Sequence, residues 1–248
     1  MEFHLQASLA EIESRSSFSA LALQRYQFPE QWKTKALSAA CKRKGISTEF
    51  VGELVKSYET SVSKEVFSHF AIPVIVDYLC RTHQLYLTKK LPEIEQSLTH
   101  LVYGYQEKQP YLLVIKALFD RYKMNLIKHI DHEEKKFLPH VLYVCDHFYR
   151  GACKNKFYAK VSKYSVNTFI NQHDDTEAEL NLILKSVKKY APAQMEASLF
   201  RVLKEQITAL EYDLHIHAII EDEVLVPKAL AMEKSCIGNR LNFRLGIK

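Results

Sequence analysis

The sequence predicts an all-α protein, an antiparallel four-helix bundle preceded by a small N-terminal helical domain. Nearly every strongly patterned segment repeats its apolar residues at spacings of three and four, the period of an amphipathic helix. Four of these segments are long and joined by short breaks, as in a helix bundle. Glycine is also scarce, with six in 248 residues, or about a third of its average usage. This scarcity argues against sheet architectures rich in tight turns.

The N-terminal part is expected to form three short helices, at residues 18–27, 30–44 and 47–60. Pro29 separates the first two, and Gly45 follows a basic run as a helix stop. Ser47 or Thr48 can cap the third helix. The polar stretch 60–63 then marks a boundary, which divides the chain into a domain at 1–62 and a bundle at 63–248.

The bundle is expected to contain four long helices, separated by turn-forming residues. Their ranges are 64–103, 110–148, 157–189 and 194–234, with breaks at 104–110, 151–155 and 191–193. Prolines interrupt three of these helices, at Pro73, Pro92, Pro139 and Pro227. A proline inside a helix removes a hydrogen bond and clashes with the preceding turn. The helices are therefore expected to bend or restart at these positions.

Composition and short motifs exclude several classes of function. The sequence contains neither of two glycine-rich nucleotide-binding motifs, G-x-G-x-x-G and G-x-x-x-x-G-K. The net charge of +5 is spread among acidic residues, which favours a solvated surface over a nucleic-acid interface. No signal peptide or membrane span is evident. Five cysteines without a C-x-x-C pair are typical of reduced thiols in the cytosol, so we expect a cytoplasmic protein that contacts neither nucleic acid nor membrane.

The most informative motif is H-x-x-x-E, which occurs once on each of two long helices. It places His129 with Glu133, and His217 with Glu221, and in both cases a proline follows the histidine by ten residues. A spacing of four puts both side chains on one helix face, about one turn apart. An imidazole nitrogen and a carboxylate oxygen can then reach the same metal ion or a neighbouring one.

The other two long helices each carry a histidine at a matching depth, His83 and His173. The resulting set of four imidazoles and two carboxylates contains no thiolate, and such nitrogen and oxygen donors suit iron or manganese. Ferritin-like bundles use Glu-x-x-His motifs with additional glutamates. Here histidine outnumbers carboxylate, which favours a partly open di-iron site that binds a small ligand such as dioxygen or nitric oxide.

Some neighbouring residues are alternatives or accessories to this site. Glu177 lies four residues after His173 and is a further candidate ligand, whereas Asp213 lies four before His217 and could accept its other ring N–H. Residues that could line the site are Tyr86, Tyr122, Phe169 and Leu225. The remaining histidines are interpreted as surface or packing residues, or have no partner at a useful spacing: His4, His69, His100, His132, His140, His147 and His215.

Four segments carry a resemblance to a known family. They are residues 77–83 with the following Leu91-Pro92, His129 to Glu133 with Phe137-Leu138-Pro139, Gln172-His173-Asp174, and His217 to Glu221 with Val226-Pro227. In these segments the chain resembles the hemerythrin-like proteins. More closely, it resembles the di-iron proteins that repair iron–sulfur clusters after nitrosative and oxidative stress, the repair of iron centres family.

The resemblance implies a ligand set and a function. It makes His83, His129, His173 and His217 terminal ligands, and Glu133 and Glu221 bridges between two non-heme irons that also share an oxo bridge. It implies a protein that binds or processes nitric oxide or oxygen species and supports repair of damaged iron–sulfur proteins, more a stress protein than a classical enzyme. The alternative is a reversible oxygen carrier or sensor. A homodimer is compatible with either function.

The N-terminal part is similar to the family's small helical domain over residues 20–58, and the chain departs from the family's pattern at two places, one in this domain and one in the bundle. Where the family commonly has Cys-Cys-Gly-Gly, this chain has Pro29-Glu-Gln-Trp32. Where the family tends to have a glutamate before the third ligand histidine, this chain has Gln172. Thiol chemistry is therefore not expected of this N-terminal domain.

Overall fold

The computed structural model describes residues 5–107, 109–151, 154–172, 176–189 and 197–244, and these are helical almost throughout. Within these ranges, β-type pairing is limited to an isolated bridge between Ser8 and Ala36. The prediction of an all-α protein is confirmed. In the same ranges, no helix is both long and apolar enough to cross a bilayer.

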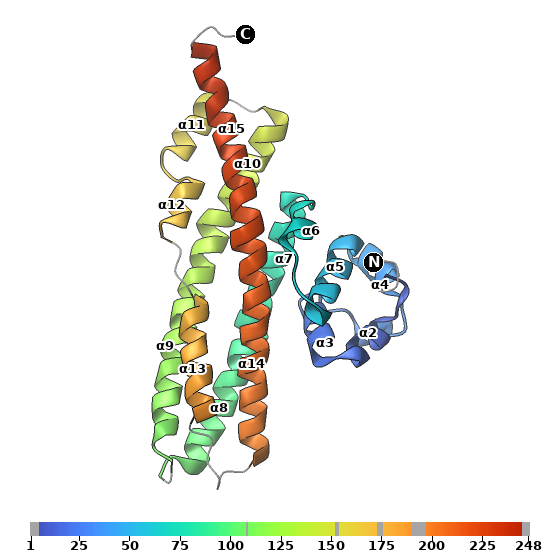
Figure 1. Ribbon diagram of the computed structural model, residues 1–248, viewed down its shortest axis with the longest axis vertical. Coiled ribbons are helices and arrows are strands. Elements are labelled where there is room, and N and C mark those ends of the chain that lie inside the picture. The colour runs from blue at the N-terminus through green and yellow to red at the C-terminus, as the bar shows by residue number, and fades with distance from the viewer. Residues whose placement is uncertain (1–4, 108, 152–153, 173–175, 190–196, 245–248) are drawn as a thin grey trace.

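The N-terminal helices, α2 to α5, form a compact group beside the middle of the long helices (Figure 1). Their bounds are Leu9–Arg15 for α2, Ser17–Gln24 for α3, Leu37–Lys44 for α4 and Thr48–Glu59 for α5, with a short 3₁₀ turn, η1, at Glu30–Trp32. Ser47 caps α5 by accepting a hydrogen bond from the Phe50 amide, as the sequence predicts.

The single helix expected at 30–44 is wrong, because a turn at residues 33–36 separates η1 from α4. Backbone pairing across the N-terminal helices explains the break. The Leu9 amide donates to the Lys35 carbonyl, and the Leu37 amide donates to the Ala7 carbonyl. These bonds join segments almost thirty residues apart, and they take the place of helical bonds in 33–36. Helix α2 was not predicted from the sequence, although it begins with a capping box between Ser8 and Glu11.

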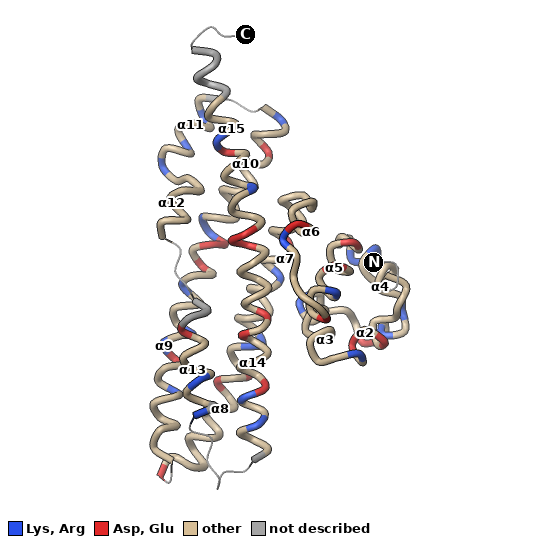
Figure 2. Tube along the Cα trace, viewed as in Figure 1, with Lys and Arg blue, Asp and Glu red and all other residues tan. Residues whose placement is uncertain are grey.

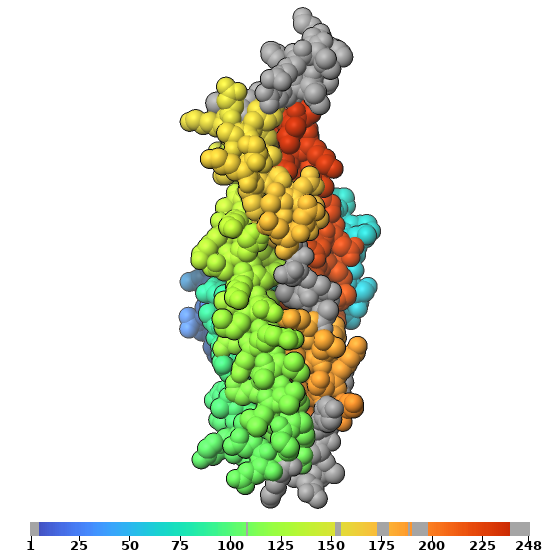
Figure 3. All heavy atoms as spheres, turned by 90° about the vertical axis from the view of Figure 1, so that its left-hand side faces the viewer, coloured from blue at the N-terminus to red at the C-terminus, as the bar shows by residue number. Residues whose placement is uncertain are grey.

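The remaining helices, α6 to α15, are arranged along the length of the molecule (Figure 1). Their bounds are Lys64–Ser68 for α6, Ile72–Leu85 for α7, Leu91–Tyr105 for α8, Tyr111–His132 for α9, Leu138–Arg150 for α10, Lys154–Val161 for α11, Val166–Ile170 for α12, Thr176–Lys189 for α13, Ala197–Ile220 for α14 and Val226–Arg244 for α15. In one half, α8 and α13 each pack against both α9 and α14. In the other half, α15 packs against α10 and α12, and Figure 3 shows α11 and α12 covering one side of this half.

Three π-helical turns separate consecutive long helices, and each is followed by a proline. They are η2 at Tyr86–Lys90, η3 at Glu133–Phe137 and η4 at Glu221–Leu225. In each case the proline is the second residue of the next helix. Proline has no amide hydrogen to donate and crowds the preceding turn, and the wider π turn accommodates it. The prediction that the helices restart at Pro92, Pro139 and Pro227 is confirmed.

The single helix expected at 157–189 is wrong, because this region is divided among α11, α12 and α13. Ser165 caps α12 by accepting from the Thr168 amide. The Glu233 carboxylate of α15 also accepts from the Val166 amide, at 3.2 Å, and lies 2.7 Å from His140 Nε2. This buried carboxylate holds the start of α12 against α10 and α15, so a tertiary contact ends the local helical pattern.

Replacing Glu233 with alanine is expected to lower the free energy of unfolding by about 2 to 4 kcal/mol, since it leaves buried polar groups of His140 and Val166 without an acceptor. Urea unfolding followed by circular dichroism measures this change. Glu205→Ala is the control, because that side chain is 69% exposed, and an exposed ion pair contributes at most about 1 kcal/mol. Equal effects of the two substitutions would contradict the assigned role of Glu233.

Candidate metal centre

Four of the six predicted ligands converge where the π turns begin. His83 lies near the end of α7 and His217 near the end of α14, while Glu133 and Glu221 are the first residues of η3 and η4. Figure 2 shows acidic stretches of two long helices next to each other at mid-height. Two apolar clusters meet at this level, one on α8, α9, α13 and α14, the other joining the N-terminal helices to the opposite half.

The ligand atoms of these four residues all lie within 4.8 Å of one another. His83 Nε2 is 3.2 Å from Glu133 Oε2, and His217 Nε2 is 3.1 Å from Glu221 Oε2. All four side chains are buried, with at most 7% of their surface exposed. A group of two imidazoles and two carboxylates this compact is able to hold a metal ion.

His129 lies at the edge of the cluster. Its Nε2 is 2.7 Å from Glu133 Oε1, and its side chain is 15% exposed. The two oxygens of Glu133 therefore face different histidines, His83 on one side and His129 on the other. His173, the sixth predicted ligand, lies outside the described residues, as does the side chain of Glu177.

The surroundings of His83 and His217 shift the pKa values of these two histidines in opposite directions. Burial lowers the pKa of His83, but the nearby carboxylates of Glu133 and Glu134 raise it by more, so that the pKa is about 9. Burial, together with the nearby His83, lowers the pKa of His217 to about 3. In the metal-free protein at neutral pH, His83 therefore carries a proton on its ring that a metal ligand cannot keep, whereas His217 is already neutral.

Unsatisfied polar atoms in the cluster fit a bound cation. Among the described residues, Nε2 of His83 and Nδ1 of His217 are buried and have no hydrogen-bond partner. The 3.2 Å approach of His83 to Glu133 is thus a close contact without hydrogen-bond geometry. An unpaired buried polar atom costs about 1 to 3 kcal/mol, and two adjacent buried carboxylates repel each other. A metal cation coordinated here would satisfy Nε2 of His83 and would relieve the repulsion between Glu133 and Glu221.

Glu134 is a site residue that no pattern in the sequence indicated. Its Oε1 lies 3.2 Å from Nδ1 of His83, on the ring edge opposite the cluster. A carboxylate in this position orients a ligating imidazole and raises its basicity. The contact joins residues 51 positions apart, and helix periodicity could not reveal it.

The expected role of Asp213 is wrong. Asp213 Oδ1 accepts hydrogen bonds from Arg25 and Tyr58, and His217 Nδ1 is without a partner among the described residues. Burial of a complete guanidinium beside Asp213 explains the difference, because an opposite charge is a stronger partner than a neutral ring N–H.

The residues expected to line the site are all buried. The Tyr86 ring lies 5.9 Å from the His217 ring, edge to face. Phe169 stacks on Phe137 of η3, with ring centres 3.6 Å apart, so it supports the turn that begins at Glu133.

The other described histidines lie outside the cluster, as predicted. His69, His100 and His215 are exposed. His140 bonds to Glu233, and His147 stacks on Phe157 with ring centres 4.0 Å apart. His132 packs beside Phe169.

The fold and the cluster define an all-helical protein with a buried histidine–carboxylate site able to hold a metal. No family model matches the chain. The chain is 20% identical over 154 residues to the iron–sulfur cluster repair protein ScdA of Staphylococcus epidermidis, in strains ATCC 35984 and ATCC 12228. The match covers 62% of this chain and 65% of each relative, so the chain spans just under two thirds of their length. This similarity supports a distant relationship to iron–sulfur cluster repair proteins.

Proposed function

We propose that this chain is a hemerythrin-like di-iron protein that supports repair of iron–sulfur clusters under nitrosative or oxidative stress. The observation that carries the proposal is the convergence of His83, Glu133, His217 and Glu221 in a buried cluster. The similarity to the iron–sulfur cluster repair proteins of Staphylococcus epidermidis supports the repair role. The proposal includes a bundle at 63–248 with four principal helices and a separate N-terminal domain at 1–62, in the cytoplasm.

The residues divide naturally into the ligands of two iron ions. Glu133 faces His83 with one oxygen and His129 with the other, an arrangement suited to a carboxylate that bridges two ions. Glu221 is the second proposed bridge, and His173 the remaining terminal ligand. When bound, the irons supply redox chemistry and open positions for nitric oxide or dioxygen.

The chain's own residues prepare and shield the site. Glu134 orients the His83 ring, and the buried ring of Tyr86, beside His217, excludes water from the apolar side. His129 is the most exposed of the described proposed ligands. A small ligand therefore has its shortest access from solvent beside His129.

Iron content and repair activity test this proposal together. Protein produced with sufficient iron is expected to hold about two irons per chain, and to reactivate an iron–sulfur enzyme whose cluster nitric oxide has damaged. Metal-free protein is the control and should not reactivate the enzyme. Absence of bound iron would overturn the di-iron proposal. Bound iron with reversible oxygen binding and no reactivation would instead indicate a carrier or sensor.

Metal uptake is also expected to release a proton from His83. Because the pKa of this ring is about 9 in the metal-free protein, the ring is protonated at pH 7.5 and must lose its proton to coordinate a metal. His217, with a pKa of about 3, is already neutral and releases none. Metal affinity should therefore rise with pH and level off above about pH 9.

Calorimetric titration with dilute Co²⁺ in two buffers of different ionisation enthalpy measures this release. About one proton per chain is expected at pH 7.5 from His83, and about half as much at pH 9. Equal release at both pH values would contradict the assignment of the proton to His83.

A further inference from the structure

A charged side chain from the N-terminal helices is buried among the long helices. Arg25 directly follows α3, and its guanidinium is fully buried. It donates from Nη1 to Thr82 Oγ1 at 2.7 Å, and from Nη2 to Asp213 Oδ1 at 2.6 Å and to Tyr58 Oη at 2.6 Å. One side chain thus joins α5, α7 and α14.

The two long-helix partners of Arg25 lie beside proposed ligands. Thr82 directly precedes His83 on α7, and Asp213 lies one turn before His217 on α14. The rings of these two histidines are only 5.1 Å apart. Both helices leave the α geometry within about one turn after these histidines, at η2 and η4, so the spacing of the two helices at this level depends on contacts made just before those turns.

We propose that Arg25 is a positioning residue for the metal centre, through which the N-terminal helices fix the spacing of His83 and His217 and so set the metal affinity. The inference rests on the metal centre of the proposed function and assigns a role to the N-terminal helices. Arg25 acts through Thr82 and Asp213, and no contact with a ligand is required.

The chemistry of the contact favours positioning over simple packing. Burying an ion pair carries a large desolvation cost, and apolar residues of similar volume often stabilise such a site as well or better. What a guanidinium adds is direction, because its planar fork fixes the relative orientation of several acceptors at once. Here those acceptors belong to the two helices that carry His83 and His217.

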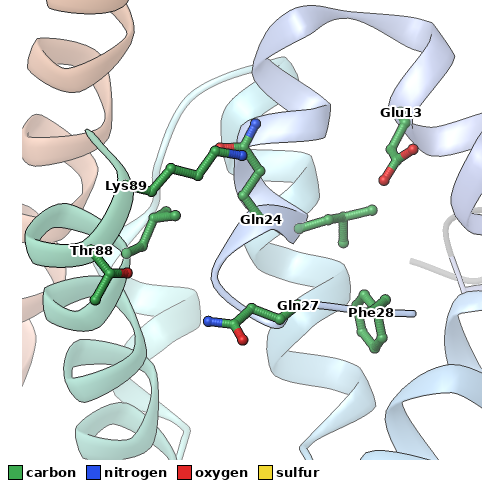
Figure 4. A pocket seen from close by; sticks show the side chains of 8 residues that line it. Glu13, Gln24, Gln27, Phe28, Thr88 and Lys89 are labelled. Atoms are coloured by element: carbon green, nitrogen blue, oxygen red, sulfur yellow. The ribbon is translucent and has the colours of Figure 1, made fainter. Parts of the chain in front are cut away.

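Other contacts between the N-terminal helices and the long helices fix the orientation of the helices less well. Phe18 packs on Tyr212 of α14, with ring centres 4.4 Å apart, an apolar contact without fixed direction. Near η2 the N-terminal helices and the long helices are not tightly packed. A pocket of about 310 Å³ lies between Gln24 and Gln27 on one side and Thr88 and Lys89 on the other (Figure 4). Tyr212 Oη also donates to the Tyr58 carbonyl, at 3.4 Å. Among the described residues, the hydrogen bonds that join the N-terminal helices to the long helices are therefore concentrated at Arg25 and its partner Tyr58.

A substitution at Thr82 separates this role from general stability. Thr82→Val removes the acceptor of Arg25 Nη1 and leaves the Arg25–Asp213 pair intact. It also removes a hydrogen bond from Thr82 to the Tyr78 carbonyl. Thr99→Val is the matched control, because Thr99 donates only to the Glu95 carbonyl, four residues back on its own helix. Thr82→Ser restores the hydroxyl and serves as the rescue.

Titration of the metal-free full-length chain with Co²⁺, followed by visible absorption, reports both affinity and ligand geometry. Thr82→Val is expected to weaken binding by about 5- to 10-fold, somewhat less than groups bonded directly to a ligand, and to shift the absorption bands. Arg25→Lys, which lacks the planar fork, should weaken binding at least as much. Thr99→Val and Thr82→Ser should match the wild type.

The outcomes separate this inference from the proposed function. Failure of the wild type to bind metal would overturn the metal centre itself. A wild type that binds, with Thr82→Val and Arg25→Lys showing the same affinity and the same bands, would overturn only the positioning role. If Thr82→Val and Thr99→Val weakened binding equally, the helix hydroxyl bond would be the cause, and the positioning role would again be rejected.

Discussion

Replacing Glu133 with glutamine is expected to weaken metal binding by at least about 100-fold, beyond the loss typical of groups that only orient a ligand. Glu133 is fully buried, and its two oxygens face two different histidines. Glutamine has nearly the same shape, but it offers one acceptor oxygen in place of two and lacks the negative charge. Iron content after purification, and Co²⁺ titration of the metal-free protein, measure the loss.

Glu223→Gln is the matched control for this change. Glu223 lies in η4, two residues after Glu221, and its exposed carboxylate pairs with Lys64. The Glu223→Gln variant should keep its full metal content, because the Glu223 side chain is 49% exposed and lies outside the cluster. Circular dichroism should show unchanged helicity in both variants. Full metal occupancy in Glu133→Gln would rule out Glu133 as a ligand.

The part of the site that the sequence could predict is local in the chain. The pairs His129–Glu133 and His217–Glu221 each lie on consecutive turns, so a spacing of four was enough to place both members on one face. The structure puts each pair within 3.1 Å. The distance between the two pairs, in contrast, depends on how separate helices pack, and no spacing in the sequence records it.

Contacts between distant segments account for what the sequence could not predict. The bond from Glu134 to His83 and the pair of Arg25 with Asp213 join residues 51 and 188 positions apart. In the same way, Glu233 interrupts a helical pattern 67 residues before it in the chain. Helical periodicity describes the face that a residue occupies, whereas these features depend on which other element meets that face.

The π turns are an intermediate case. The prolines at 92, 139 and 227 indicated where the helices restart, because the missing amide hydrogen is a local property. They did not indicate that the chain widens into a π turn there. Such turns are rare and often occur at functional sites. In this protein, two of the three begin with a carboxylate of the cluster, so the same local change that accommodates proline also presents Glu133 and Glu221 to the interior.

The Arg25–Asp213 pair is expected to give the largest effect of a single substitution on folding. Asp213→Ala should lower the free energy of unfolding by about 3 to 5 kcal/mol, because it leaves a fully buried guanidinium without its counter-charge. Asp77→Ala is the control. It removes an Arg–Asp pair of similar length at the surface, and such a pair contributes at most about 1 kcal/mol. Urea unfolding of the metal-free variants compares them.

A double variant distinguishes the two consequences of this pair. Arg25→Met with Asp213→Asn removes both charges and keeps an acceptor for Tyr58, so most of the lost stability should return. Metal affinity should remain below that of the wild type, since neither new side chain holds α7 and α14 at a fixed spacing. Recovery of both properties together would mean that the buried pair only stabilises the fold. Recovery of stability alone would separate folding from positioning, which is the result we expect if the N-terminal helices act on the metal centre.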